Sequence, residues 1–145
     1  MKKLAAIYER KGQLFVTASH KTAAGFWIDD EQVASLSQPS HDELGRAIEQ
    51  ALARSQEGVP TPPPDARIGK PLLAAAGVRS WATFMKLSKH VSVVSDGSLL
   101  KVTPYRNLGS KEGFEPEPDI AVPSANSASA LGQMVANLLS RAALA

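Results

Sequence analysis

Cysteine is absent from the 145 residues of this chain. Its absence excludes disulfide bonds, thiolate zinc sites and cysteine nucleophiles, and it favours a reducing compartment. No apolar run approaches the roughly 20 residues needed to cross a bilayer. The N-terminal apolar run, residues 4–8, ends at Glu9-Arg10-Lys11 and is too short for a signal peptide. We therefore expect a cytoplasmic protein without a membrane span.

Motifs of catalysis and cofactor binding are also missing. The sequence has no glycine-rich nucleotide loop, no phosphate loop and no Gly-x-Ser-x-Gly turn. None of its three histidines, His20, His41 and His90, has a second metal-ligand residue three or four positions away. The sequence predicts no metal, no cofactor and no enzymatic activity.

Charge is unevenly distributed, although the formal net charge is only +2. Residues 66–90 contain no acid and carry five cations: Arg67, Lys70, Arg79, Lys86 and Lys89. Two acidic segments lie elsewhere, Asp29-Asp30-Glu31 and the group Glu112, Glu115, Glu117 and Asp119. Mixed charge of this kind most often serves solubility, but each acidic segment lies beside a Gly-Phe pair, at matching places in the chain.

Those matching places belong to a longer internal repeat. Gly12 before a Leu-rich strand pattern returns as Gly97, Gly25-Phe26 returns as Gly113-Phe114, and Leu44-Gly45 returns as Leu131-Gly132. The ordered matches predict one domain, residues 1–145, built from a repeat over 2–55 and 89–143. A proline-rich connector, 56–71, and a helical insert, 72–88, would separate the two units.

Each unit is predicted to contain a β-hairpin, a third strand and a helix. Asp96-Gly97 is a strong hairpin signal in the second unit, because both turn residues tolerate positive φ. The third strand is expected over 26–28 or 32–36 in the first unit and over 120–122 in the second. Apolar residues at helical spacing predict helices over 44–52 and 131–139, the first opened by a capping box at Ser40. In the insert, Trp81, Phe84 and Met85 share one helical face, which is typical of core residues.

These elements predict an α/β (α+β) fold, with a mixed or antiparallel sheet of about 5–7 strands and helices mainly on one face. Gly45 and Gly132 each stand in the opening turn of a predicted helix, where glycine costs about 1 kcal/mol relative to alanine. We expect them to mark a close backbone contact with the sheet or the partner helix.

The second half resembles one branch of the immunity proteins of contact-dependent growth inhibition, the CdiI type. The resemblance rests on Ser80-Trp81-Ala82-Thr83-Phe84, the Val91-Ser92-Val93 hairpin strand, the Val102-Thr103-Pro104 strand, an acidic loop and the Leu131-Gly132 helix. It covers about residues 75–143, roughly half of the chain.

The resemblance implies a cytoplasmic protein that binds the C-terminal domain of a toxin, often a nuclease acting on transfer RNA, and performs no catalysis. Its partner would be that toxin domain in a heterodimer, with neither a membrane nor a nucleic acid bound directly. A nuclease presents positive potential, which a negative patch would complement. We therefore expect one toxin-binding edge formed by both acidic segments, with Phe26, Trp27 and Phe114 as candidate aromatic anchors. The candidate toxin-binding residues are Asp29, Asp30, Glu31, Glu112, Phe114, Glu115, Glu117 and Asp119.

Two other interpretations stay open at this point. The basic segment 67–89 could bind nucleic acid, with Trp81 and Phe84 as stacking groups. A small hydrolase could use Asp29, Asp30 or His41 as an acid or base, which would require a deep pocket where these side chains converge.

Overall fold

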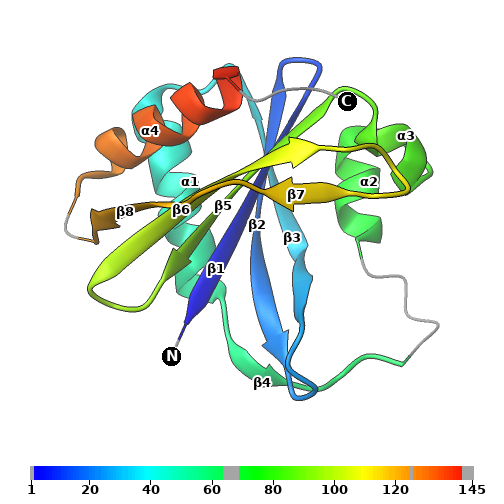
Figure 1. Cartoon of the computed structure of the whole chain (residues 1–145), viewed down its shortest axis with the longest axis horizontal. Helices are drawn as coiled ribbons and strands as arrows, with labels where there is room; N and C mark the ends of the chain where they lie inside the picture. The colour runs from blue at the N-terminus through cyan, green and yellow to red at the C-terminus, as the bar shows by residue number, and fades with distance from the viewer. Residues whose placement is uncertain (1, 64–68, 125, 142–145) are drawn as a thin grey trace.

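The structure is a computed structural model that describes residues 2–63, 69–124 and 126–141. Eight strands and four helices follow one another along the described chain (Figure 1). In order they are β1 (Lys3–Arg10), β2 (Gln13–Thr22), β3 (Trp27–Ser37), α1 (His41–Arg54), β4 (Glu57–Val59), α2 (Lys70–Ala76), α3 (Trp81–Met85), β5 (Ser88–Ser95), β6 (Leu99–Asn107), β7 (Phe114–Pro116), β8 (Ile120–Pro123) and α4 (Ala128–Arg141).

All eight strands belong to one sheet, whose main path runs β3-β2-β1-β5-β6-β7. The two hairpins, β1–β2 and β5–β6, meet at the centre, where β1 pairs antiparallel with β5 along its whole length. Only β4 is parallel to its partner, β2, and β8 pairs with β6 beside β7. The predicted α+β fold class is confirmed, and its mixed sheet has eight strands.

The third strand of the first unit contains both segments that the sequence offered as alternatives. β3 runs continuously from Trp27 to Ser37 and pairs with β2, and the register shifts between Thr17 and Ser19. The extra residue of such a bulge lets a long strand stay paired while it bends. Asp29, Asp30 and Glu31 consequently lie within a strand and not in the expected loop.

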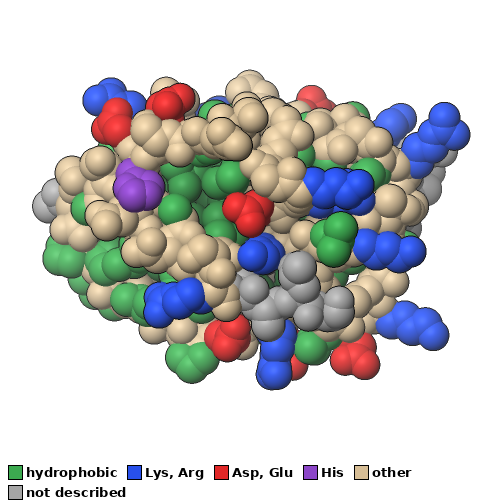
Figure 2. All heavy atoms as spheres, turned by 90° about the horizontal axis from the view of Figure 1, so that it is seen from above, with side chains coloured by type: hydrophobic (Ala, Val, Ile, Leu, Met, Phe, Trp, Pro, Cys, Tyr) green, Lys and Arg blue, Asp and Glu red, His purple; other side chains and the backbone are tan. Residues whose placement is uncertain are grey.

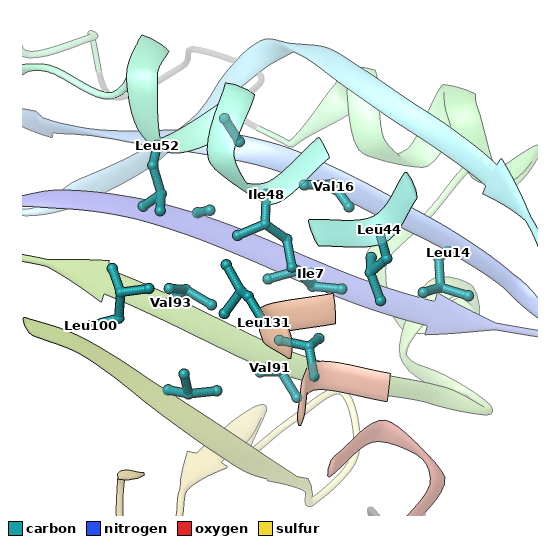
Figure 3. Close-up of a cluster of buried hydrophobic side chains, with 14 of the residues drawn as sticks. Ile7, Leu14, Val16, Leu44, Ile48, Leu52, Val91, Val93, Leu100 and Leu131 are labelled. Carbon is teal, nitrogen blue, oxygen red and sulfur yellow. The ribbon is translucent and has the colours of Figure 1, made fainter. Parts of the chain in front are cut away.

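The main core lies between one face of the sheet and the two long helices, α1 and α4. Alternate residues of the central strands point toward these helices. Leu44 and Ile48 of α1 and Leu131 of α4 pack into the same cluster (Figure 3). The capping box of α1 is confirmed: the Glu43 amide donates to the Ser40 hydroxyl, and the Ser40 amide donates to the Glu43 carboxylate.

The two helices cross where each has its glycine. A Cβ atom built on Gly45 would overlap the backbone carbonyl of Ala128, and one built on Gly132 would overlap the carbonyl of His41. Each glycine therefore lets the first turn of the other helix approach its backbone, which confirms the predicted close contact with the partner helix.

The two short helices of the insert cover part of the opposite face. There a second core gathers Ala6, Tyr8, Phe15, Leu72 and Phe84. The two long helices, α1 and α4, share one face of the sheet, as expected. The two short helices lie on the other face, because the sheet has apolar residues on both faces. No helix in the described part of the chain is long and apolar enough to cross a membrane.

The helix crossing generates a stability prediction. Gly45→Ala should lower the free energy of unfolding by about 3 kcal/mol, because the new methyl group collides with a backbone that cannot move aside. At an ordinary helical site the same change would stabilise by about 1 kcal/mol. The urea midpoint measures the effect, with Gln50→Ala on the exposed side of α1 as the control. An unchanged or higher midpoint for Gly45→Ala would contradict the contact.

Candidate functional site

The first acidic segment lines a pocket of the described chain, a cavity of about 770 Å³. β3 forms one wall, the connector after β4 forms another, and the start of α2 closes a third. Its apolar lining is Ile28, Val59, Pro60, Pro62, Pro71 and Ala74, and its polar lining includes His20, Asp29, Asp30, Glu31 and Lys70. The carboxylates therefore stand beside an apolar hollow.

Asp29 is half-buried, and both of its carboxylate oxygens are bonded. Its Oδ1 accepts a hydrogen bond from the Ser19 hydroxyl at 2.8 Å, and its Oδ2 lies 3.4 Å from the Tyr8 hydroxyl. Burial raises the pKa of Asp29 above its usual value, while the bonds from Ser19 and Tyr8 act in the opposite direction. Both oxygens are occupied, so Asp29 positions Tyr8 and is not a free surface charge.

Asp30 is occupied as well, whereas Glu31 is exposed. Asp30 accepts from Arg54 at 3.3 Å and lies 3.5 Å from His20 Nε2, and the Glu31 amide donates to it at 2.7 Å. Partial burial raises the pKa of Asp30, but the bonds from the Glu31 amide and from Arg54 outweigh it and leave the pKa below the usual value. Glu31 is the one carboxylate of this segment that faces solvent.

A column of rings lies on the sheet face that α2 and α3 cover, and the sequence did not predict it. The registers of β1, β5 and β6 place Tyr8, His90 and Tyr105 side by side, and successive ring centroids are 4.3 Å apart. His90 Nδ1 lies 2.9 Å from the Ile7 carbonyl oxygen, so Nδ1 carries the hydrogen. Burial lowers the pKa of His90 to about 4 and keeps the ring neutral at pH 7.

The second acidic segment begins beside this column. The ring of Phe114, the first residue of β7, lies 5.0 Å from His90 and 6.1 Å from Tyr8. The acids around it are exposed: Glu112 stands in the turn before β7, Glu115 pairs with Arg106 at 3.3 Å, and Glu117 and Asp119 follow β7. Half-buried Phe114 therefore fixes an exposed acidic loop to the sheet.

The two acidic segments do not form the single edge that was expected. β3 and β7 stand at opposite ends of the main strand path, because the β1–β2 and β5–β6 hairpins meet at the central β1–β5 pair. What connects them is Tyr8, which contacts Asp29 through its hydroxyl and Phe114 through its ring. Figure 1 shows β7 crossing over β1 and β2 as the sheet twists.

Among the predicted anchors only Phe26 is largely exposed, at 47%, while Trp27 and Phe114 are half-buried. The hydrolase interpretation loses His41, which begins α1 against Gly132 and does not line the pocket. The histidine that lies beside Asp30 is His20, whose Nδ1 accepts a hydrogen bond from the Gln56 amide. In the nucleic-acid interpretation, the prediction that Phe84 stacks on a base is wrong, because Phe84 is fully buried. Trp81 is 39% exposed. Arg67 lies outside the described residues.

Comparison with known proteins identifies the fold. No protein-family model matches the chain, and no curated protein sequence matches it. The fold is that of a set of solved α+β structures matched over nearly the whole chain.

One of these is NMB0488, a protein of unknown function from Neisseria meningitidis, with a TM-score of 0.80 and 19% identity over 99% of this chain and 96% of that one. Another is a chain of the CdiA-CT/CdiI toxin and immunity complex from Yersinia pseudotuberculosis, with a TM-score of 0.77 and 15% identity over 99% of this chain and 98% of that one.

The ring column generates a pH prediction. Between pH 6.5 and about 4 the unfolded chain protonates His90 and the native chain does not, so stability should fall as the pH decreases through this window. The whole shift corresponds to about 3 kcal/mol. Urea unfolding at a series of pH values measures it.

Asp29 shifts in the opposite sense, because its raised pKa makes the native state hold a proton longer. His90→Phe is therefore the control: it keeps a stacking ring and removes the titration, while the loss of the bond to the Ile7 carbonyl affects stability equally at every pH. An equal loss of stability in wild type and His90→Phe at low pH would exclude His90 as the source.

Proposed function

We propose that this chain is an immunity protein that binds and neutralises a cognate toxin domain of contact-dependent growth inhibition, without catalysis of its own. The toxin is a nuclease, such as one that cleaves transfer RNA. The observation that carries the proposal is the similarity, over nearly the full length of both chains, to a chain of a toxin and immunity complex. At 15% identity this likeness concerns the fold, so the partner is inferred from the surface described above.

The exposed acids supply the recognition. Glu31, Glu112, Glu115, Glu117 and Asp119 face solvent and complement the positive potential of a nuclease. Association between opposite potentials is fast and selective, and salt weakens it. Asp29 and Asp30 act differently: bonded to Ser19, Tyr8, His20 and Arg54, they fix β3 so that Glu31 and Phe26 are presented rigidly.

Phe114 connects recognition to the fold. Its ring packs against Tyr8 and His90, which belong to the two central strands. A loop fixed in this way loses little conformational entropy when a partner binds, so more of the contact energy is retained as affinity. Phe26 supplies an exposed aromatic anchor at the other end of the sheet.

Growth rescue tests the function directly. Bacteria that produce the toxin domain encoded beside this chain should survive when they also produce the chain, because the toxin is captured stoichiometrically. A toxin domain from an unrelated system is the control and should still kill. Failure to rescue growth from any adjacent toxin domain, with folded chain present in the cells, would contradict the proposal.

Charge removal tests the surface. Glu117→Gln together with Asp119→Asn should slow toxin association about fivefold at low ionic strength and much less at high ionic strength. Asp42→Asn together with Glu49→Gln removes the same charge from α1 and should leave association unchanged. Stopped-flow association rates provide the measurement. Equal effects of the two double variants would remove the 112–119 segment from the interface.

A further inference from the structure

A basic surface surrounds α3 at the end of the molecule that carries the insert. α3 itself supplies Trp81, and the residues flanking it supply Arg79, Lys86 and Leu87. In Figure 2 lysine and arginine side chains gather at the right, the side on which Figure 1 places α2 and α3. We name the set Arg10, Lys11, Arg79, Trp81, Lys86, Leu87 and Lys111 the α3 surface.

Three separate parts of the chain bring these cations together. Arg10 Nη2 lies 3.5 Å from the Thr83 carbonyl oxygen of α3, and Arg10 pairs with Ser88 in the sheet, so Lys11 follows beside Leu87. The Asn107 side-chain amide donates to the Met85 and Ser88 carbonyls at 2.6 and 2.8 Å. That bond fixes the end of β6, and with it the 108–113 turn that carries Lys111, against the end of α3.

Four of the five cations of the α3 surface are exposed to solvent. Among the described residues, Arg10, Lys11, Arg79, Lys86 and Lys111 form no ion pair with a carboxylate. Arg10 is half-buried, and its Nη2 lies against the Thr83 carbonyl oxygen, so this side chain serves to place α3. The four exposed cations without a carboxylate partner, Lys11, Arg79, Lys86 and Lys111, favour a polyanionic ligand.

Two apolar side chains stand among these cations at a cost to the fold. Trp81 is 39% exposed and stacks on buried Phe84, whose centroid is 5.3 Å away. Leu87 is 53% exposed and has a φ of 67°, a left-handed conformation that is unfavourable for leucine. Backbone strain combined with apolar exposure is typical of a binding surface.

We propose that the α3 surface binds single-stranded nucleic acid, an activity that goes beyond toxin neutralisation. Trp81 offers a ring face to a base, Phe84 holds that ring in place, and the surrounding cations contact successive phosphates. Stacking on an exposed ring amid cations is the arrangement by which proteins bind single strands without reading their sequence. An acidic protein would also use the cations, and competition by polyglutamate distinguishes it from a nucleic acid. This proposal revises the expectation from the sequence that no nucleic acid is bound directly.

Fluorescence anisotropy of a labelled oligouridylate of about 12 nucleotides tests the proposal with the full chain. Binding should weaken with salt, and the slope of log K against log salt should be about −2 to −3.5 for three to five phosphate contacts. Arg79→Glu together with Lys86→Glu should weaken binding at least about tenfold at low salt. Lys101→Glu, exposed on β6 at about 20 Å from Asn107 along the strand, should change it less than about twofold.

The ring is tested separately. Trp81→Ala should weaken binding about 5- to 100-fold, and Trp81→Phe should restore most of the loss. No binding at low salt would overturn the proposal, as would charge reversals at α3 that match Lys101→Glu. Equal competition by polyglutamate of similar length would overturn it in favour of an acidic protein partner. Because growth rescue needs no added nucleic acid, failure of either experiment leaves the other interpretable.

Discussion

The contact between α1 and α4 at Gly45 and Gly132 sets the spacing on which the rest of the structure depends. Each glycine accepts the backbone of the opposite helix, so the two helices lie closer than side chains would allow. That approach seats both helices over the central β1–β5 pair and closes the main core. With this face filled by helices, the opposite face remains for the ring column, the insert and the surfaces that we assign to partners.

The two faces therefore have different tasks. The face covered by α1 and α4 is apolar and closely packed, and this packing stabilises the fold. The opposite face contains buried polar groups that bond to one another, such as Asp29 with Ser19 and His90 with the Ile7 carbonyl. Such groups are costly to bury unless every partner is in place. The free-energy cost of burying them is offset in function where they hold exposed residues, Glu31 and the 112–119 acids, in fixed positions for a partner.

Local signals allowed much of the fold to be predicted, and long-range pairing hid the rest. The Asp96-Gly97 turn, the Ser40 capping box and the two helical stripes depend on neighbouring residues, and all are present. The column of Tyr8, His90 and Tyr105 depends on pairing between strands far apart in sequence, with His90 bonded to a residue 83 positions away. No local pattern announces it. The contacts of Asp29 with Ser19 and Tyr8 were hidden for the same reason, because they follow from the register shift between β2 and β3. The boundaries of the proposed repeat stay a prediction.

Hydrogen exchange of the chain, free and with the toxin domain encoded beside it, tests the central claim most directly, because it reports which face a partner covers. The account predicts slower amide exchange in the 112–119 segment and around Glu31 in β3, with little change in α1 and α4. Protection confined to α1 and α4 would contradict it, since the partner would then lie on the face that we assign to stability.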